Sequence, residues 1–140
     1  MNSKDVSISI IKTSSILNEK LSHALKPYGI TIQQFNVLRI LRGLNGVAAN
    51  LSTVQNQMLN KMSNTTRLVD KLINKSLVNR TICKENRRKI ELYITDEGLK
   101  MLDTLDPVVE KTEEKFAQSL SSSEKKEVVT FLKKMINTNH

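Results

Sequence analysis

Residues 63–75 read SNTTRLVDKLINK and decide the fold, because they have the spacing of one amphipathic helix. Apolar side chains recur at steps of three and four, which places them on one face: Leu68, Val69, Leu72 and Ile73. The opposite face is polar and presents Asn64, Arg67, Lys71 and Asn74. Asparagine and arginine can make bidentate contacts with adenine and guanine edges. The stretch therefore predicts either a helix that contacts bases or an ordinary solvated helix face.

A second short helix is expected immediately before this one. Residues 51–53 read LST and offer an N-cap for a helix that runs to about Leu59, with Leu59 on its inner side. Residues 60–62 then form a turn, and Ser63 is a good N-cap for the helix that follows, from residue 64 to about residue 75. Two short helices joined by a tight turn predict a helix-turn-helix unit.

A β-hairpin is expected after the second of these helices. Residues 77–84 and 89–94 are rich in β-branched and aromatic residues, and the polar run KENRR lies between them. A hairpin in this position is typical of a wing. Its cations either contact phosphates or pair with Glu85 and Glu91, and an arginine at a hairpin tip can enter a narrow minor groove. These cations are Lys84, Arg87, Arg88 and Lys89.

Long helices are expected at both ends of the chain. Apolar spacing predicts one over about residues 6–26, and a second begins at Thr31, which can form a capping box with Gln34. Thr95 is expected to cap a long acidic helix, and Glu124 begins the last one. The fold class is therefore mainly α with a small β wing. Apolar stripes on terminal helices are most simply buried against a two-fold partner.

The positive charge of the chain is concentrated around the predicted wing. The chain of 140 residues has a net charge of +8. Residues 61–91 contain nine Lys/Arg and three acidic residues, whereas residues 95–127 contain nine acidic residues and five lysines. A basic region of this kind favours a polyanionic partner, either nucleic acid or an anionic membrane surface.

Several other classes of protein are disfavoured. No stretch approaches the roughly 18 apolar residues of a membrane-spanning helix, and the N-terminus lacks the pattern of a signal peptide, so we expect a cytoplasmic protein without a membrane partner. One cysteine and two histidines form no cluster with zinc spacing, so neither a metal nor a cofactor is expected. No nucleophile with a nearby base and no phosphate loop is recognisable, so we do not expect an enzyme.

Three segments together resemble the MarR (multiple antibiotic resistance regulator) family of winged helix-turn-helix transcriptional regulators. Residues 30–38, ITIQQFNVL, are similar to its LT-x-x-Q-x-x-V-L segment. Residues 66–72, TRLVDKL, and 75–80, KSLVNR, are similar to T-R-x-x-D-R-L and K-G-L-V-x-R. Residues 86–88, NRR, followed by ITDEG at 94–98, resemble the wing signature D-R-R and the downstream L-T-x-x-G.

The resemblance implies a homodimer that binds double-stranded DNA at a pseudo-palindromic operator. One domain over residues 1–140 would contain the DNA-binding region at 30–98 and helical dimerisation regions at 1–29 and 99–140. Helix residues would face the major groove, wing residues would contact the flanking DNA, and the first helical turn would contact phosphates. The resemblance implies these roles for Asn64, Thr65, Thr66, Arg67, Lys71 and Arg88. Ser63 joins the predicted contacts because it lies at the helix N-terminus, and Arg87 and Lys89 join them through the charge of the wing.

Two residues depart from the family pattern. Ser76 replaces the usual glycine after the base-contacting helix, at a position where a left-handed residue often lies. Asn86 replaces the wing aspartate that would brace an arginine by charge. The turn after the helix is therefore expected to be strained or differently shaped, and the wing to be less rigid.

Regulation and two alternative functions stay open at the level of sequence. The resemblance implies repression that is relieved by a small phenolic or carboxylate effector in a cleft, which His23, Tyr28 and Arg39 would line unless each only satisfies a polar neighbour. A thiol-based redox regulator would use Cys83, although a strand cysteine is more often inert. An architectural protein that binds DNA without sequence preference would need only the charge.

Overall fold

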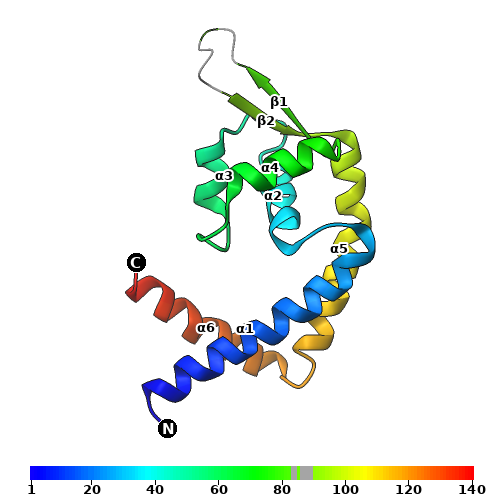
Figure 1. Ribbon diagram of the computed structural model, residues 1–140. Helices are drawn as coiled ribbons and strands as arrows, with labels where there is room; N and C mark the ends of the chain where they lie inside the picture. The colour runs from blue at the N-terminus through cyan, green and yellow to red at the C-terminus, as the bar shows by residue number, and fades with distance from the viewer. Residues whose placement is uncertain (83–84, 86–89) are drawn as a thin grey trace.

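The computed structural model describes residues 1–82, 85 and 90–140. Within them the chain forms six α-helices, one short 3-10 helix and a two-stranded antiparallel sheet. Figure 1 shows α2, α3, α4 and the sheet gathered in one lobe, from which α5 leads to the terminal helices α1 and α6. This architecture confirms the predicted class, mainly α with a small β wing. No helix in the described part of the chain is long and apolar enough to span a membrane.

The first two helices begin at local capping signals. Helix α1 (Ser3–Leu25) starts at Asn2 and is followed by η1 (Lys26–Tyr28), which ends at Gly29 with a left-handed φ of 69°. Helix α2 (Ile32–Gly43) begins with the predicted capping box, in which Thr31 and Gln34 exchange two hydrogen bonds of 3.1 Å. The two predicted helices at the N-terminal end are therefore confirmed.

The helix-turn-helix consists of α3 (Leu51–Gln57) and α4 (Thr65–Asn74), as predicted. The expected caps are wrong by one or more residues. Asn50 caps α3 by accepting a 2.8 Å hydrogen bond from the Thr53 amide, and Asn64, rather than Ser63, caps α4. Asparagine caps as well as serine does, so spacing alone could not choose between neighbours. Because α3 ends at Gln57, Leu59 lies in the turn with 88% of its surface exposed, not on the inner side.

Strands β1 (Val78–Ile82) and β2 (Ile90–Ile94) form the predicted hairpin, with Val78 opposite Ile94 and Ile82 opposite Ile90. The base of the hairpin is attached to the helical lobe through Ala49 and Leu92. Their backbones exchange hydrogen bonds of 3.3 and 2.7 Å, and both residues are buried. The wing is therefore anchored just before α3.

Helix α5 (Asp96–Phe116) starts at Thr95, which accepts a 3.0 Å hydrogen bond from the Gly98 amide, as predicted. Gly98 has a packing reason to be glycine. A Cβ there would lie 2.4 Å from the Leu77 carbonyl oxygen and 2.6 Å from Ile94 Cγ1, so no larger residue fits without a shift. The last helix, α6 (Ser122–Thr138), begins two residues before the predicted Glu124, because Ser121 caps it in a capping box with Glu124.

One apolar core holds the lobe together. Its completely buried members include Val37 and Leu38 of α2, Leu72 of α4 and Leu102 of α5. Helix α6 contributes no buried residue, and the first half of α1 is exposed. We refer to residues 30–110 as the winged-helix lobe, and to residues 3–16 together with α6 as the terminal arms. Figure 1 shows the arms extending away from the lobe.

Candidate nucleic-acid interface

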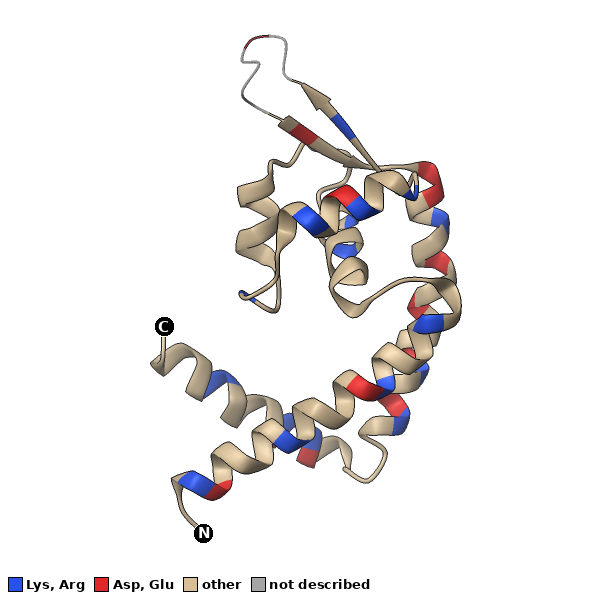
Figure 2. Ribbon diagram, viewed as in Figure 1, with Lys and Arg blue, Asp and Glu red and all other residues tan. Residues whose placement is uncertain are grey.

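Helix α4 has one buried face and one exposed polar face. Val69 and Leu72 are 2% and 0% exposed, and they pack into the core of the lobe. The opposite face is exposed at four of the predicted positions: Asn64, Thr66, Arg67 and Lys71. Figure 2 shows basic as well as acidic residues on α4, a basic residue on β1, and acidic residues interspersed with basic ones along α5. The packing of α4 thus fixes which side chains are free to contact a ligand.

The N-terminal end of α4 differs from the expectation at Thr65. This residue is 6% exposed, and its hydroxyl donates a hydrogen bond to Gln55 Oε1, so it faces the protein and not a groove. The reason is helical geometry, because Thr65 lies four residues before Val69 and seven before Leu72 and so shares their buried face. The helical spacing of the sequence was therefore sufficient to predict that Thr65 is buried.

Two neighbouring side chains at this end of α4 have different roles. Asn64 Oδ1 accepts a 3.2 Å hydrogen bond from the Arg67 amide, which leaves the amide nitrogen of its side chain for an outside partner. The Ser63 hydroxyl oxygen is buried and has no hydrogen-bond partner among the described residues. A groove of about 250 Å³ lies beside these residues, between Thr31 and Gln33 on α2 and Arg67 and Lys71 on α4.

The described part of the wing adds one basic residue to this surface. Arg80 on β1 lies 3.9 Å from Asp70 on α4, measured from Nη1 to Oδ1, and both side chains are more than half exposed. The pair links the wing to α4, although an exposed ion pair contributes little to stability. The predicted wing contacts Arg87, Arg88 and Lys89, together with Cys83 and Asn86, lie outside the described residues.

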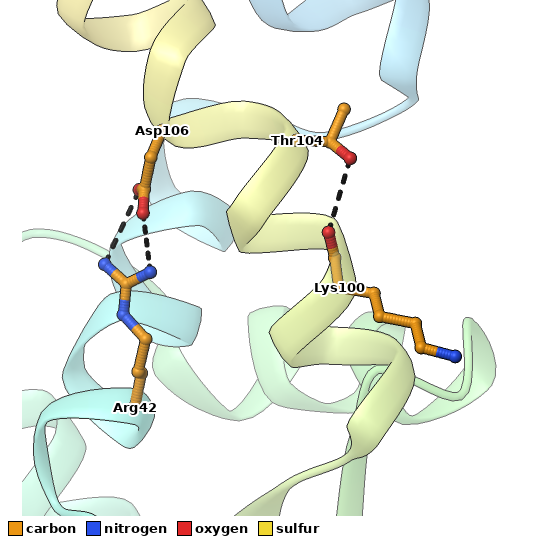
Figure 3. A network of polar contacts seen from close by, with 4 residues as sticks. All are labelled: Arg42, Lys100, Thr104 and Asp106. Atoms are coloured by element: carbon orange, nitrogen blue, oxygen red, sulfur yellow. Dashed lines mark hydrogen bonds and ion pairs between the residues drawn. The ribbon is translucent and has the colours of Figure 1, made fainter.

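An ion pair that sequence reasoning missed braces the lobe behind α4. Arg42 at the end of α2 donates hydrogen bonds of 2.6 and 3.5 Å to the two carboxylate oxygens of Asp106 on α5 (Figure 3). Both side chains are about two-thirds buried. The residues are 64 positions apart, so only their opposite charges hinted at the contact. Thr104 and Lys100, also drawn in Figure 3, form a separate bond within α5.

Two clefts lie beside α1 and α5. One, of about 90 Å³, lies between α1, α2 and α5; its walls include Leu25, Phe35, Val109 and Arg39, whose guanidinium lies 5.6 Å from the centre of the Phe35 ring. The other, of about 510 Å³, lies between α1 and α5 and includes His23. Of the three residues expected to line a cleft, His23 and Arg39 therefore do so, in different clefts. Tyr28 lines neither of the two.

A helix-turn-helix followed directly by a β-hairpin, with an exposed donor face on its second helix, defines the class of winged helix-turn-helix DNA-binding proteins. Comparison with known proteins agrees. The sequence model of the MarR family matches residues 30–90. The HTH-type transcriptional regulator SarZ of Staphylococcus haemolyticus is 27% identical over 127 residues, which cover 91% of this chain and 84% of SarZ.

Two solved structures have the same fold. The MarR transcription factor of Planctomyces limnophilus superposes with a TM-score of 0.73 at 27% identity, covering 95% of this chain and 96% of that one. BpsR of Bordetella bronchiseptica, whose DNA binding is regulated by 6-hydroxynicotinic acid, gives a TM-score of 0.84 at 20% identity, covering 94% and 98%. Over residues 30–90 the chain is similar to the MarR family, and the relatives that it matches are transcriptional regulators of the helix-turn-helix type.

Proposed function

We propose that this protein is a homodimeric repressor that acts in the cytoplasm, binds a pseudo-palindromic operator through α4 and is released by a small-molecule effector. The observation that carries the proposal is the two-sided packing of α4. Val69 and Leu72 anchor one face in the core, while Asn64, Arg67 and Lys71 remain exposed on the other. A helix held in this way presents a constant set of donors to the major groove.

Individual roles follow from the chemistry of the exposed groups. Arg67 and the free amide nitrogen of Asn64 contact base edges, and Lys71 and Thr66 contact phosphate oxygens. Ser63 joins the phosphate contacts only if its buried hydroxyl turns outward on binding. Thr65 is left out of the contact set, because its hydroxyl is bonded to Gln55. From their sequence alone, Arg87, Arg88 and Lys89 supply the contacts of the wing.

The terminal arms supply the dimer interface in this proposal. Their large apolar side chains are exposed in the single chain, for example Ile11 at 68% and Phe131 at 61%. Exposed apolar surface on two long amphipathic helices marks a protein interface, and a second copy offers the same helices by symmetry. Two recognition helices separated by one turn of DNA, ~34 to 36 Å, would then occupy successive major grooves. Repression follows from occlusion of the promoter.

The effector in this proposal is a small aromatic carboxylate or phenol that binds the cleft between α1, α2 and α5. Phe35, Leu25 and Val109 provide apolar walls there, and the guanidinium of Arg39 provides a partner for an anion. The cleft of about 90 Å³ would have to widen to admit such a ligand, because small-molecule pockets usually have ~300 Å³ or more. DNA binding by the structurally similar BpsR is regulated by 6-hydroxynicotinic acid, an aromatic ring that carries a carboxyl group and a hydroxyl group. Binding at this position would act where α1 and α5 meet the helix-turn-helix.

The proposal is tested by Arg67→Ala. We expect this change to reduce the discrimination between operator and random DNA by about 1–3 kcal/mol, because a bidentate base contact is lost. Binding is measured over a range of salt concentrations, on a duplex that the unchanged protein selects from a random pool and on a scrambled duplex of equal length. Lys100→Ala, which removes one positive charge from exposed α5, is the control and should leave the discrimination unchanged.

Equal losses of Arg67→Ala on both duplexes would contradict the base contact. If the unchanged protein selects no duplex but binds all DNA with a steep dependence on salt, the architectural alternative holds instead, as its net charge of +8 would allow. The redox alternative is tested separately by Cys83→Ser, which would abolish a response of DNA binding to peroxide.

A further inference from the structure

Side-chain amides hold the turn between α3 and α4. The carbonyl oxygen of the Asn36 side chain, on α2, accepts a 2.9 Å hydrogen bond from the Leu59 amide. Within the turn, Asn60 Oδ1 accepts one of 2.9 Å from the Met62 amide. These bonds attach the backbone of the turn to side chains at both its beginning and its middle, in addition to the apolar anchor that the buried Met58 provides. This matters because Leu59 and Met62 themselves are 88% and 91% exposed.

Gln55 connects this turn to the first residue of α4. Its Nε2 donates a 3.1 Å hydrogen bond to the Lys61 carbonyl oxygen, and its Oε1 accepts the hydrogen bond from the hydroxyl of Thr65. Gln55 lies on α3 and is partly buried, and Thr65 is 6% exposed. One side-chain amide therefore bonds two points of the chain that are four residues apart, on either side of the Asn64 cap.

We infer that Gln55 is a positioning residue for base recognition. It holds the first turn of α4, and with it Asn64 and Arg67, in a constant position relative to the rest of the lobe. Bidentate base contacts need donors that are held to within about 0.5 Å, and such precision comes from supporting hydrogen bonds as well as from apolar packing. The inference rests on the proposed role of α4 in contacting bases. Gln55 itself acts only by placing the side chains that contact the bases.

The test separates position from stability with two variants. Gln55→Met keeps the approximate volume of the side chain but leaves the buried Thr65 hydroxyl without its acceptor. The double variant Gln55→Met/Thr65→Val also removes that hydroxyl, so no unpaired donor is left. Each is measured for its melting temperature and for binding to the selected and the scrambled duplex at several salt concentrations.

We expect Gln55→Met to reduce the preference for the selected duplex about 10-fold, the size of one poorly matched base pair, with an unchanged dependence of binding on salt. The double variant should recover the melting temperature but not the preference. Gln57→Met is the matched control, because Gln57 is exposed on the same helix and its side chain bonds to no described residue. It should retain the full preference.

Three results would overturn the inference. They are an unchanged preference in Gln55→Met, an equal loss in Gln57→Met, and a preference that returns with the melting temperature in the double variant, which would show a structural role only. If the unchanged protein itself shows no preference between duplexes, the proposed function fails, and the inference fails with it for that separate reason.

Discussion

The winged-helix lobe and the terminal arms have similar amphipathic patterns, but the chain buries only the apolar face of the lobe. Leu38 and Leu72 are 0% exposed, whereas Ile11 and Phe131 in the arms are 68% and 61% exposed. The two regions differ in the packing partners that the chain itself provides. Helices in the lobe pack on α5 and on the sheet, while α6 buries no residue in its own chain. The lobe is thus stabilised within one chain, whereas the exposed faces of the arms would be buried by the second copy in the proposed dimer.

The largest effect on stability is expected from truncating a side chain in the core of the lobe. Leu38→Ala should lower the free energy of unfolding by about 2–5 kcal/mol, because it leaves a cavity among residues of the same chain. Urea unfolding followed by circular dichroism measures the change. Leu59→Ala is the matched control: Leu59 is 88% exposed, and its loss should cost less than about 0.5 kcal/mol. Equal effects would contradict the assigned core.

The same kind of deletion in an arm should act on association instead. Phe131→Ala removes an exposed apolar side chain of α6 that the proposed dimer buries, so the dimer should weaken by about 1.5–3 kcal/mol, or roughly 10- to 150-fold in Kd. Sedimentation equilibrium over a range of protein concentrations measures this. Lys133→Ala on the same helix is the control. A mass distribution that does not respond to Phe131→Ala would exclude this face from the interface.

A smaller change is expected in the turn between α4 and β1. Ser76 has a φ of 63°, as the departure from the family pattern suggested, and this conformation costs a non-glycine residue about 1–2 kcal/mol. Ser76→Gly removes the strain but gives back about 0.5–1 kcal/mol in chain entropy. A net stabilisation of about 0.5–1 kcal/mol is therefore expected in urea unfolding.

Asn45→Gly offers a matched comparison with Ser76→Gly. Asn45 also has a positive φ, 50°, but asparagine tolerates this region better than serine, so its replacement should stabilise less. A loss of stability in Ser76→Gly would mean that the serine side chain makes a compensating contact.

The smallest effect concerns the exposed N-terminal end of α6. A hydrogen bond from the Ser121 backbone amide, helped by the Ser121 hydroxyl, lowers the pKa of Glu124 below its usual value. A lowered folded-state pKa stabilises the cap above the ordinary glutamate pKa, and this stabilisation is lost as the pH falls through the lowered value. The protection factor of the Ser121 amide, which is its exchange rate relative to the intrinsic rate at the same pH, should therefore fall on acidification.

Glu124→Gln should remove this pH dependence, because glutamine keeps a carbonyl acceptor but does not titrate in this range. Glu127→Gln, a second such change on α6, should leave it in place. Persistence of the acid response in Glu124→Gln would assign it to another group.

Local signals were sufficient for much of the fold. The capping box at Thr31 and the cap at Thr95 act over three residues, so their sequence spacing implies their geometry. The exposed face of α4 follows in the same way from its helical period. The sequence did not predict that Asn50 and Asn64 are the caps, because neighbouring residues cap equally well. The packing of the turn determines which of them caps the helix.

The sequence by itself determined the helical periods, the wing hairpin and the positive charge beside the helix-turn-helix, because these depend on residues that are close in the chain. Only the tertiary structure decided that Arg42 pairs with Asp106, that Gly98 must lack a Cβ beside Leu77, and that Gln55 supports Thr65. Such contacts join separate elements, and each side chain had many chemically equivalent partners until packing brought one of them within reach.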